Sequence, residues 1–358
     1  MYPASPIAAP PSQPNRRSAA GPTIVAFGGG TGLPNVLRGL RPLVFDGDAA
    51  SNDRLVAIVA TSDDGGSSGR LRAEFNVIPP GDIRNCLAAL SDNHELIVDL
   101  FQYRFGAGTG LSGHALGNLV LTALAEVAHD FPRAVEIAAR VVGAQGTVLP
   151  ATSEGVTLVA RFEDGRVLRG ETAIASARGR IERVSLSPAS PRTPPEVRDA
   201  LRRADAVVVG PGSLYTSILP PLLVPGVADA IRESSAIRIL VANLMTEAGE
   251  TDGYCLFDHV RTLRDHLGCQ LFDYVIYSTS PVPARLAEPY AGRGARPIVM
   301  RLCELKALEA LGLQPIGIPL LSEHPAGKIR HHPERLAAAI AALAHGKLGA
   351  WRRRTEEL

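Results

Sequence analysis

The chain has 358 residues, of which 46% are hydrophobic and 20% are charged, and its formal net charge is +1. This length suits one large or two smaller α/β domains with a substantial core. The nearly balanced charge argues against a nucleic-acid binder, because such proteins contact many phosphates through a basic surface. The sequence contains neither a membrane span of about 18 apolar residues nor the apolar segment of a secretory signal, so we expect a cytoplasmic protein.

Composition divides the chain into a central domain and two tails. Residues 1–22 are rich in proline, serine and alanine, which predicts a disordered tail, and residues 346–358 form a charged tail. We predict one nucleotide-binding α/β domain over residues 23–345, with a small antiparallel β insert at residues 148–187. Four cysteines occur without any C-x-x-C pair, which predicts reduced and mostly buried thiols.

Hydrophobic patterns predict alternating strands and helices, and therefore a Rossmann-like, doubly wound and mostly parallel sheet. Apolar runs without strict alternation are expected for strands that helices cover on both faces. The insert alternates polar and apolar residues around Asp164-Gly165, which is typical of a β-hairpin. Sheet strands are predicted at 23–27, 54–60, 205–210, 237–243, 272–278 and 298–301. Helices are predicted at about 33–40, 82–91, 94–104, 115–129, 132–142, 255–267 and 333–345.

The first predicted strand ends in a glycine-rich loop, Gly28-Gly29-Gly30-Thr31-Gly32-Leu33. Glycines let the backbone approach a phosphate closely, and the N-terminus of the following helix supplies free N–H donors. The loop is no dinucleotide fingerprint, because Leu33 stands where G-x-G-x-x-G needs its third glycine, and it is no P-loop, because no Gly-Lys-Ser/Thr follows. We predict a phosphate-binding loop, with a ligand-free tight turn as the alternative.

The second predicted strand is followed by two adjacent carboxylates, Asp63 and Asp64. Carboxylates at a strand end can hold a sugar hydroxyl or a divalent cation such as Mg²⁺, or activate an acceptor hydroxyl. Ser67 and Ser68 can form an anion nest with the nearby glycine amides, and Arg70 can neutralise a phosphate. The alternative is structural, with a turn at Asp64 and a helix cap at Ser67 or Ser68.

Two further segments open predicted helices and carry polar residues. Asp82 and Asn85 follow Pro-Pro-Gly, where Asp82 serves either as a helix N-cap or as a ligand contact. His114 and Asn118 lie at the start of the helix at 115–129. The helix dipole disfavours an imidazolium there, so we expect a neutral His114. This histidine is either structural or a phosphate or proton-transfer group.

A second loop of glycines and hydroxyls follows the strand at 205–210. It contains Gly210, Gly212, Ser213 and Tyr215 and precedes a predicted helix, which suits a second phosphate. A strained connection without ligand is the alternative. We expect this loop to converge with the first one, because ligands of doubly wound sheets lie at the carboxyl ends of the strands.

Polar residues near two later segment boundaries complete the predicted ligand site. Asn243 and Thr246 follow the strand at 237–243 and are placed either to read a base or sugar edge or to form a turn. Arg330 and His331 precede the last helix and can contact phosphate, whereas the histidine spacing there does not suit zinc.

Six of these segments together resemble the gluconeogenesis-factor family (YvcK type), which is similar to the phospholactate transferase (CofD type) that builds the deazaflavin coenzyme. The resemblance extends over residues 23–345 and rests on long motifs in the same order. The motifs are GGGTGL at 28–33, SDDGGSSGRLR at 62–72, PPGDIRN at 79–85, GHALGN at 113–118, GPGSLYTSILP at 210–220 and NLMTEAGETDGY at 243–254.

The resemblance implies a cytoplasmic factor that binds a nucleotide sugar of the UDP-N-acetylglucosamine type. It also implies a role in cell shape and cell-wall growth when carbon flows through gluconeogenesis, with cell-wall synthesis or morphogenesis proteins as partners. We also expect a homo-oligomer. By the same likeness, the first loop, Asp63 and Asp64 lie at the cleft, the loop from Gly210 to Ser213 holds phosphate, and the stretch at Arg330 and His331 lines the sugar site.

The transferase relatives imply an alternative activity. In that reading a phospholactyl-type group moves from a nucleotide diphosphate donor to a deazaflavin acceptor, with Asp63 and Asp64 as the candidate catalytic and Mg²⁺-binding residues. Four positions depart from the family pattern. Glu247-Ala248 replaces the usual Gln-Pro, His332 replaces an aspartate and Pro34 replaces a serine. We expect these changes to affect fine substrate contacts more than the phosphate loops.

Overall fold

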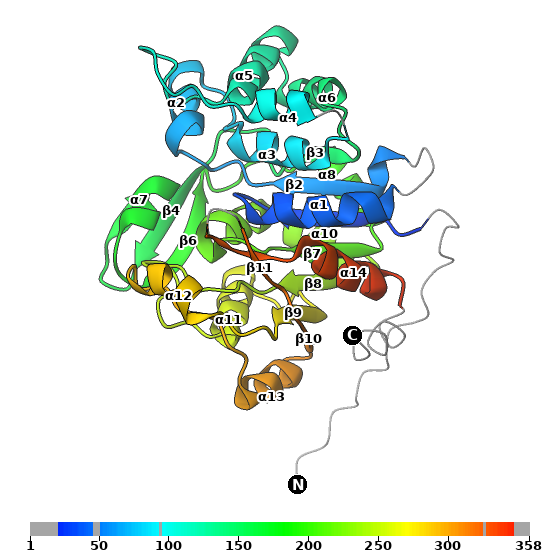
Figure 1. The fold of residues 1–358 in the computed structure, drawn as a ribbon, viewed down its shortest axis with the longest axis vertical. Helices are drawn as coiled ribbons and strands as arrows, with labels where there is room; N and C mark the ends of the chain where they lie inside the picture. The colour runs from blue at the N-terminus through cyan, green and yellow to red at the C-terminus, as the bar shows by residue number, and fades with distance from the viewer. Residues whose placement is uncertain (1–20, 46–50, 93–94, 325–326, 347–358) are drawn as a thin grey trace.

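A parallel sheet of seven strands lies at the centre of the protein (Figure 1). The structure is a computed structural model that describes residues 21–45, 51–92, 95–324 and 327–346. The chain adds strands on one side of β1 and then continues on its other side, so the winding direction reverses between β1 and β7. In spatial order the strands are β10 (Gln314–Ile318), β9 (Tyr274–Ser278), β8 (Ile237–Val241), β7 (Ala206–Val209), β1 (Ile24–Gly28), β2 (Leu55–Val59) and β3 (Thr147–Pro150).

Alternate side chains of each strand enter two separate hydrophobic cores, one on each face of the sheet. In β1, Ile24 and Ala26 pack into the first core, whereas Val25 and Phe27 pack into the second. All four are fully buried because helices or the insert cover both faces. The predicted α/β class with a mostly parallel sheet is confirmed, and the reversal between β1 and β7 marks where such sheets bind ligands.

Two helices on the first face of the sheet, α1 (Gly32–Val44) and α14 (Pro333–Ala344), pack against each other. Figure 1 shows α2, α4, α5 and α6 gathered at one end of the molecule. The further helices that contribute to this core are α3 (Gly81–Leu90), α4 (Glu95–Gln102), α5 (Leu116–Ala128), α6 (Phe131–Val141) and α12 (Ala284–Ala291). Helix α2 (Gly66–Phe75) packs against α5. A short 3₁₀ turn (Asn52–Arg54) precedes β2.

The second face is covered by helices and by the insert. Its helices are α8 (Pro195–Arg203), α9 (Leu219–Leu222), α10 (Val227–Glu233), α11 (Leu256–Leu267) and α13 (Leu302–Ala310), with a π-helical turn (Leu214–Ile218) before α9. Among the described residues no single helix is long and apolar enough to cross a membrane. The bent helix pair Leu214–Leu222 and Val227–Glu233 together reaches the length and apolar composition of a span, and nothing beyond length and composition supports a span there.

The insert is a three-stranded antiparallel sheet in the order β5-β4-β6, with a short helix between β5 and β6 in the chain. The predicted turn at Asp164-Gly165 is confirmed, because it joins two strands that pair antiparallel. Gly165 has a φ of +87°, which favours glycine at this position of the turn. The segment at 148–150, which we assigned to the insert, instead lies in the main sheet as part of β3. The elements are β4 (Thr157–Phe162), β5 (Val167–Arg169), α7 (Glu171–Ser176) and β6 (Ile181–Ser187).

The predicted strand at 298–301 is wrong. This segment is not part of the sheet; Pro297 forms an isolated bridge with Met245, and the N–H of Ile298 donates to the carbonyl of Leu244. The position beside β9 is occupied by β10, a strand that was not predicted because Pro315 and Gly317 interrupt its apolar pattern. After β10 come the two short antiparallel strands β11 (Leu321–Glu323) and β12 (Ile329–His331).

The predicted tails lie almost entirely outside the described residues, which begin at Gly21 and end at Gly346. All four cysteines are free thiols. Only Cys86 is fully buried, whereas Cys303 is exposed, so the expectation of mostly buried thiols is wrong. Cys303 is exposed because it lies near the start of α13, a helix with few buried residues.

Candidate ligand-binding cavity

Two glycine-rich loops meet above the carboxyl ends of β1 and β7. These strands are parallel neighbours, so the loops that follow them lie side by side. Their contact requires glycine, because a Cβ at Gly32 would lie 1.9 Å from the carbonyl oxygen of Pro211. Both loops line the same cavity, so the predicted convergence is confirmed.

Asn243, at the end of the neighbouring strand β8, holds the second loop in place. Its Oδ1 accepts the N–H of Gly212 at 3.0 Å, and its Nδ2 donates to the carbonyl of Gly212 at 2.7 Å. An amide nitrogen carries two hydrogens, so one N–H remains for a ligand. Asn243 therefore positions the loop and also lines the cavity.

The cavity has a volume of about 480 Å³, which lies in the range of small-molecule sites. Opposite the two loops it is bounded by the turn after β8, the end of α12 and the strand β12. Ten of the residues predicted from sequence line it: Gly29, Gly30, Thr31, Gly32, Gly212, Ser213, Asn243, Thr246, Arg330 and His331.

Other cavity-lining residues were not predicted individually. Some lie next to predicted site residues in the same loops, and others lie in a segment without any predicted site. Tyr290 and Arg293 lie at and just after the end of α12, in a region without a glycine loop or a recognisable motif. Lys328 stands two residues before Arg330 in an extended segment, and this period of two could have indicated a shared face. The newly assigned lining residues are Asn35, Pro211, Ser217, Leu244, Met245, Glu247, Ala248, Tyr290, Arg293, Ala295, Lys328 and Ile329.

Three cationic side chains surround the cavity. The Nη1 of Arg330 donates to the Oγ1 of Thr31 at 2.5 Å, which ties β12 to the first glycine loop. Arg293 and Lys328 are exposed, and within the described part of the chain neither takes part in an ion pair. Cations that face glycine-rich backbone favour an anionic ligand.

His331 is a buried, neutral link between elements. Its Nε2 lies 2.9 Å from the carbonyl oxygen of Ala242, to which it donates, and its own carbonyl accepts the Nδ2 of Asn35 at 2.8 Å. Burial, with a smaller effect of the Arg330 charge, lowers the pKa of His331 to about 4 against the opposing hydrogen bond to Ala242. A phosphate near this residue is therefore offered a neutral imidazole, and the charge comes from Arg330.

Asp82 supports the first glycine loop from below. Of the two alternatives predicted for Asp82, the N-cap is wrong, because α3 begins at Gly81 with Pro80 in the N-cap position and without a side-chain cap. Asp82 does not line the cavity either. The Asp82 carboxylate instead accepts the N–H of Gly30 at 2.7 Å. Burial and the nearby Asp63 raise the pKa of Asp82 to about 6.

A second polar cluster lies beside this support and outside the cavity lining. The Oγ of Ser67 lies 3.0 Å from the Nδ1 of His114, and the Nδ2 of Asn118 donates to the same Oγ at 3.0 Å. Arg84 donates to the Oδ1 of Asn118 at 2.9 Å. Burial, followed by the charge of Arg70, lowers the pKa of His114, which agrees with the expected neutral imidazole.

The remaining predicted residues of this region also have protein partners. Neither serine caps α2, whose N-cap is Gly65; the Oγ of Ser68 accepts the N–H of Gly81 at 3.2 Å. Arg70 donates to the carbonyl of Ser112 at 2.8 Å, and the Oδ1 of Asn85 accepts the Nη2 of Arg84 at 2.8 Å. None of these residues lines the cavity. Three members of the two loops, Gly28, Leu33 and Gly210, do not line it either.

The two adjacent aspartates have different neighbours. The Oδ1 of Asp64 accepts both the N–H and the hydroxyl of Thr172, each at 2.8 Å, so Asp64 caps the helix α7 of the insert. The Oδ1 of Asp63 accepts the N–H of Gly65 at 2.9 Å. A third carboxyl, Glu171, joins them, accepting the hydroxyl of Ser62 at 2.6 Å, and burial raises its pKa well above the usual value.

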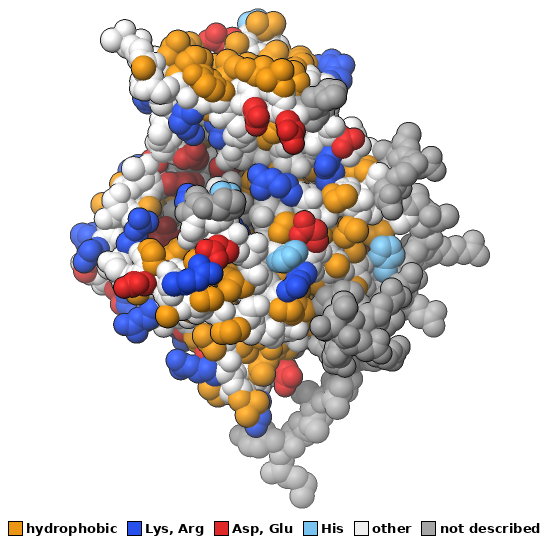
Figure 2. All heavy atoms as spheres, viewed as in Figure 1, with side chains coloured by type: hydrophobic (Ala, Val, Ile, Leu, Met, Phe, Trp, Pro, Cys, Tyr) orange, Lys and Arg blue, Asp and Glu red, His pale blue; other side chains and the backbone are white. Residues whose placement is uncertain are grey.

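The acidic cluster offers limited support for a bound cation. Figure 2 shows acidic side chains recessed in the hollow between the upper helices and the insert. In the described residues no three histidine, cysteine or acidic side chains are arranged to hold a metal ion. Mg²⁺ often takes only one or two carboxylates together with substrate phosphates, and Asp63 keeps one oxygen without a hydrogen bond in the described structure. The Oδ2 of Asp64 likewise has no hydrogen bond among the described residues, so both aspartates fit such an ion.

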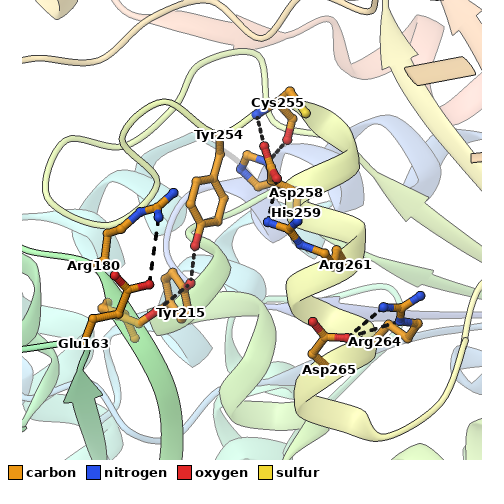
Figure 3. Close-up of polar contacts among 11 residues, drawn as sticks. Glu163, Arg180, Tyr215, Tyr254, Cys255, Asp258, His259, Arg261, Arg264 and Asp265 are labelled. Atoms are coloured by element: carbon orange, nitrogen blue, oxygen red, sulfur yellow. Dashed lines mark hydrogen bonds and ion pairs between the residues drawn. The ribbon is translucent and has the colours of Figure 1, made fainter. Parts of the chain in front are cut away.

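Tyr215 lies in the core on the insert side and does not line the cavity. Figure 3 shows its hydroxyl pointing to that of Tyr254, at a distance of 2.8 Å. It also donates to the carbonyl of Ile181 in β6, at 3.4 Å. Burial and the neighbouring Tyr254 raise the pKa of Tyr215. Tyr215 therefore connects the second glycine loop to the insert.

Comparison with known proteins agrees with this architecture. The family model described as 2-phospho-L-lactate transferase CofD matches residues 24–321. The gluconeogenesis factor of Bacillus subtilis is 43% identical over 322 residues, covering 90% of this chain and 98% of that protein. The gluconeogenesis factor of Halalkalibacterium halodurans is 41% identical over 317 residues, covering 88% of this chain and 95% of that protein.

A solved structure shows the same fold. The crystal structure of a UPF0052-family protein from Bacillus halodurans superposes with a TM-score of 0.83 at 41% identity, and the match covers 89% of this chain and 99% of that one. The range matched by the family model, residues 24–321, includes both glycine loops and ends before β12. The chain therefore belongs to the CofD/UPF0052 family, among relatives named gluconeogenesis factors.

Proposed function

We propose that the cavity binds a nucleotide sugar of the UDP-N-acetylglucosamine type, and that the protein is a binding factor for cell shape and cell-wall growth under gluconeogenic conditions. The observation that carries this proposal is the convergence of two glycine-rich loops on a cavity with three cations around it. Backbone N–H groups and cations together suit a diphosphate. The named relatives support the gluconeogenic setting.

Calorimetry with the purified chain tests the ligand. UDP-N-acetylglucosamine should bind more tightly than UDP or N-acetylglucosamine alone, because the diphosphate and the sugar occupy different parts of one cavity. If no UDP-sugar or other nucleotide sugar produces heat, the proposed ligand class is wrong.

A cellular experiment tests the role. A Bacillus subtilis strain that lacks its own gluconeogenesis factor should regain growth and normal shape on gluconeogenic carbon when it expresses this chain. A variant defective in ligand binding separates two cases: rescue without binding would show that the nucleotide sugar is not needed for the cellular role. The proposed cell-wall or morphogenesis partners and the homo-oligomer stay predictions.

The acidic cluster supports a second candidate function, transfer of a phospholactyl-type group to a deazaflavin. Asp63 and Glu171 lie beside Asp82, which contacts the first loop, so an acceptor hydroxyl near Asp63 would be close to that loop. Asp63→Asn should then lower kcat by about 10²–10⁴-fold while sparing donor binding. Absence of turnover with a phospholactyl-nucleotide donor, a deazaflavin acceptor and Mg²⁺ would rule this function out.

A further inference from the structure

Two glutamates lie behind the second glycine loop, in the turn that follows β8. Glu247 lines the cavity, and Glu250 is 7% exposed beneath it. The hydroxyl of Ser213, within the glycine loop, donates to the Oε2 of Glu250 at 2.5 Å. One carboxyl group therefore lies in the wall of a cavity that the proposed function fills with an anion, and a second is buried against the glycine loop of that cavity.

Burial and mutual repulsion make it costly for both carboxyls to carry charge. Burial, followed by the charge of Glu250, raises the pKa of Glu247 to about 7, although the Ser213 hydroxyl acts in the opposite direction. Burial also raises the pKa of Glu250, against the stabilising hydrogen bonds from Ser213 and the N–H of Tyr215. The two groups titrate as a pair, and near neutral pH that pair holds a proton on part of the molecules.

Charged groups from the surrounding elements do not neutralise Glu247. On its own turn, Asp252 accepts the N–H of Gly249, and Thr251 accepts the N–H of Glu247 through its hydroxyl. From the segment after α12, Arg296 contacts the turn through its carbonyl, which accepts the N–H of Thr246.

The remaining facing groups are the cations Arg293, Lys328 and Arg330 and the neutral His331 across the cavity. In the parts of the chain that the structure describes, none of them forms an ion pair with Glu247 or Glu250. The cations remain available to a ligand, whereas the negative charge of Glu247 stays uncompensated.

We propose that binding of a nucleotide sugar in the cavity is coupled to the uptake of one proton by the Glu247–Glu250 pair, with Glu247 as the residue that decides the coupling. This inference rests on the proposed function. An ionised Glu247 repels the diphosphate, whereas a protonated Glu247 is neutral and can donate a hydrogen bond to a ligand oxygen. The bound anion thus favours the protonated form, and linkage requires that protonation favours binding equally.

The expected signature is a pH dependence of affinity. Neither phosphate of a nucleotide sugar titrates near neutral pH, so the ligand charge stays constant. The association constant for UDP-N-acetylglucosamine should be level below about pH 6.5 and should fall by up to about tenfold per pH unit above pH 7. Calorimetry at pH 8 in two buffers with different ionisation enthalpies should show uptake that approaches one proton per ligand.

Glu247→Gln keeps the size and the hydrogen-bond donor of the protonated side chain but cannot ionise. This variant should bind with nearly the same affinity at pH 6.5 and pH 8, without proton uptake, and at pH 8 it should bind more tightly than the wild type. Glu309→Gln is the matched control, because Glu309 is exposed on α13 and does not line the cavity; it should behave as the wild type. In Glu250→Gln the coupling should move to lower pH, because Glu247 loses its charged neighbour.

The outcomes separate this inference from the proposed function. Wild-type binding that is independent of pH and takes up no proton would overturn the coupling and leave the ligand proposal intact. The same holds if Glu247→Gln keeps the full proton uptake. Failure of the wild type to bind any nucleotide sugar between pH 6 and 8 would overturn both.

Discussion

The carboxylate of Asp82 accepts the backbone N–H of Gly30 at 2.7 Å, although the two residues are separated by 52 positions in the chain. Asp82 belongs to the first turn of α3, and Gly30 is in the middle of the loop after β1. The helix thereby fixes the conformation of the first glycine loop. The raised pKa of Asp82 makes this support sensitive to pH.

Asp82→Asn should change how stability depends on pH. In the wild type the folded pKa of about 6 lies above the usual value of 3.8, so the folded state prefers the protonated carboxyl and loses stability as pH rises from about 4 through 6. This shift corresponds to about 3 kcal/mol. Asparagine keeps the acceptor for Gly30 and cannot ionise, so the variant should gain stability relative to the wild type between pH 4.5 and 7.5.

Denaturant unfolding at several pH values measures this difference. Asp99→Asn, an exposed carboxyl on α4, serves as the control and should leave the pH profile unchanged. Parallel profiles for Asp82→Asn and the wild type would show that Asp82 is ionised in both states.

Gly32→Ala should separate the two glycine loops. The new Cβ would lie 1.9 Å from the carbonyl oxygen of Pro211, so backbone must move, at a cost of about 2–4 kcal/mol in the free energy of unfolding. Binding of UDP-N-acetylglucosamine should weaken by at least tenfold. Gly155→Ala, at an exposed site where a Cβ meets no atom within 4 Å, should change neither property. Equal stability of the two variants would contradict the close approach.

Asp64→Ala should loosen the insert without unfolding the main sheet. Asp64 accepts the N–H and the hydroxyl of Thr172 in the first turn of α7, and loss of a helix cap costs about 0.5–2 kcal/mol. Hydrogen exchange should accelerate in residues 171–176 and stay unchanged in β1. Thr172→Val removes only the hydroxyl bond and should have a smaller effect. Unchanged exchange in α7 would mean that Asp64 does not hold the insert.

Arg330→Gln should weaken nucleotide-sugar binding by about 10–100-fold, because a charge-assisted contact to phosphate is lost together with the link to Thr31. Arg330→Lys should lie between the variant and the wild type, since lysine keeps the charge but loses the planar fork. The wild-type affinity should also fall with salt concentration, more steeply than that of Arg330→Gln. Lys306→Gln, outside the cavity on α13, is the charge-matched control.

Local sequence patterns were sufficient to predict the fold class and the two loops. Apolar strands that end in glycines can be predicted from sequence, because neighbouring residues set both the burial and the backbone geometry. Val25 and Phe27 before Gly28 are an example. Prediction from local patterns failed where a proline or glycine interrupts or precedes an apolar run. Strand β10 was not predicted because Pro315 and Gly317 interrupt its apolar pattern. The apolar residues at 298–301 were predicted as a strand, but they follow Pro297 in a connection outside the sheet.

The partners of polar side chains were decided only by the tertiary structure. The sequence is compatible with Asp82 as a helix cap or a ligand contact, whereas in the structure it accepts the N–H of Gly30 because α3 packs against α1. Arg293 lies outside every recognised motif, yet it faces the same cavity as Glu247 and Lys328. The reason is that the segments after β8 and α12 and the segment before β12 converge on this cavity. A motif records what the backbone can do over a few residues, whereas the charge and protonation of a site depend on groups that the chain brings together from hundreds of residues away.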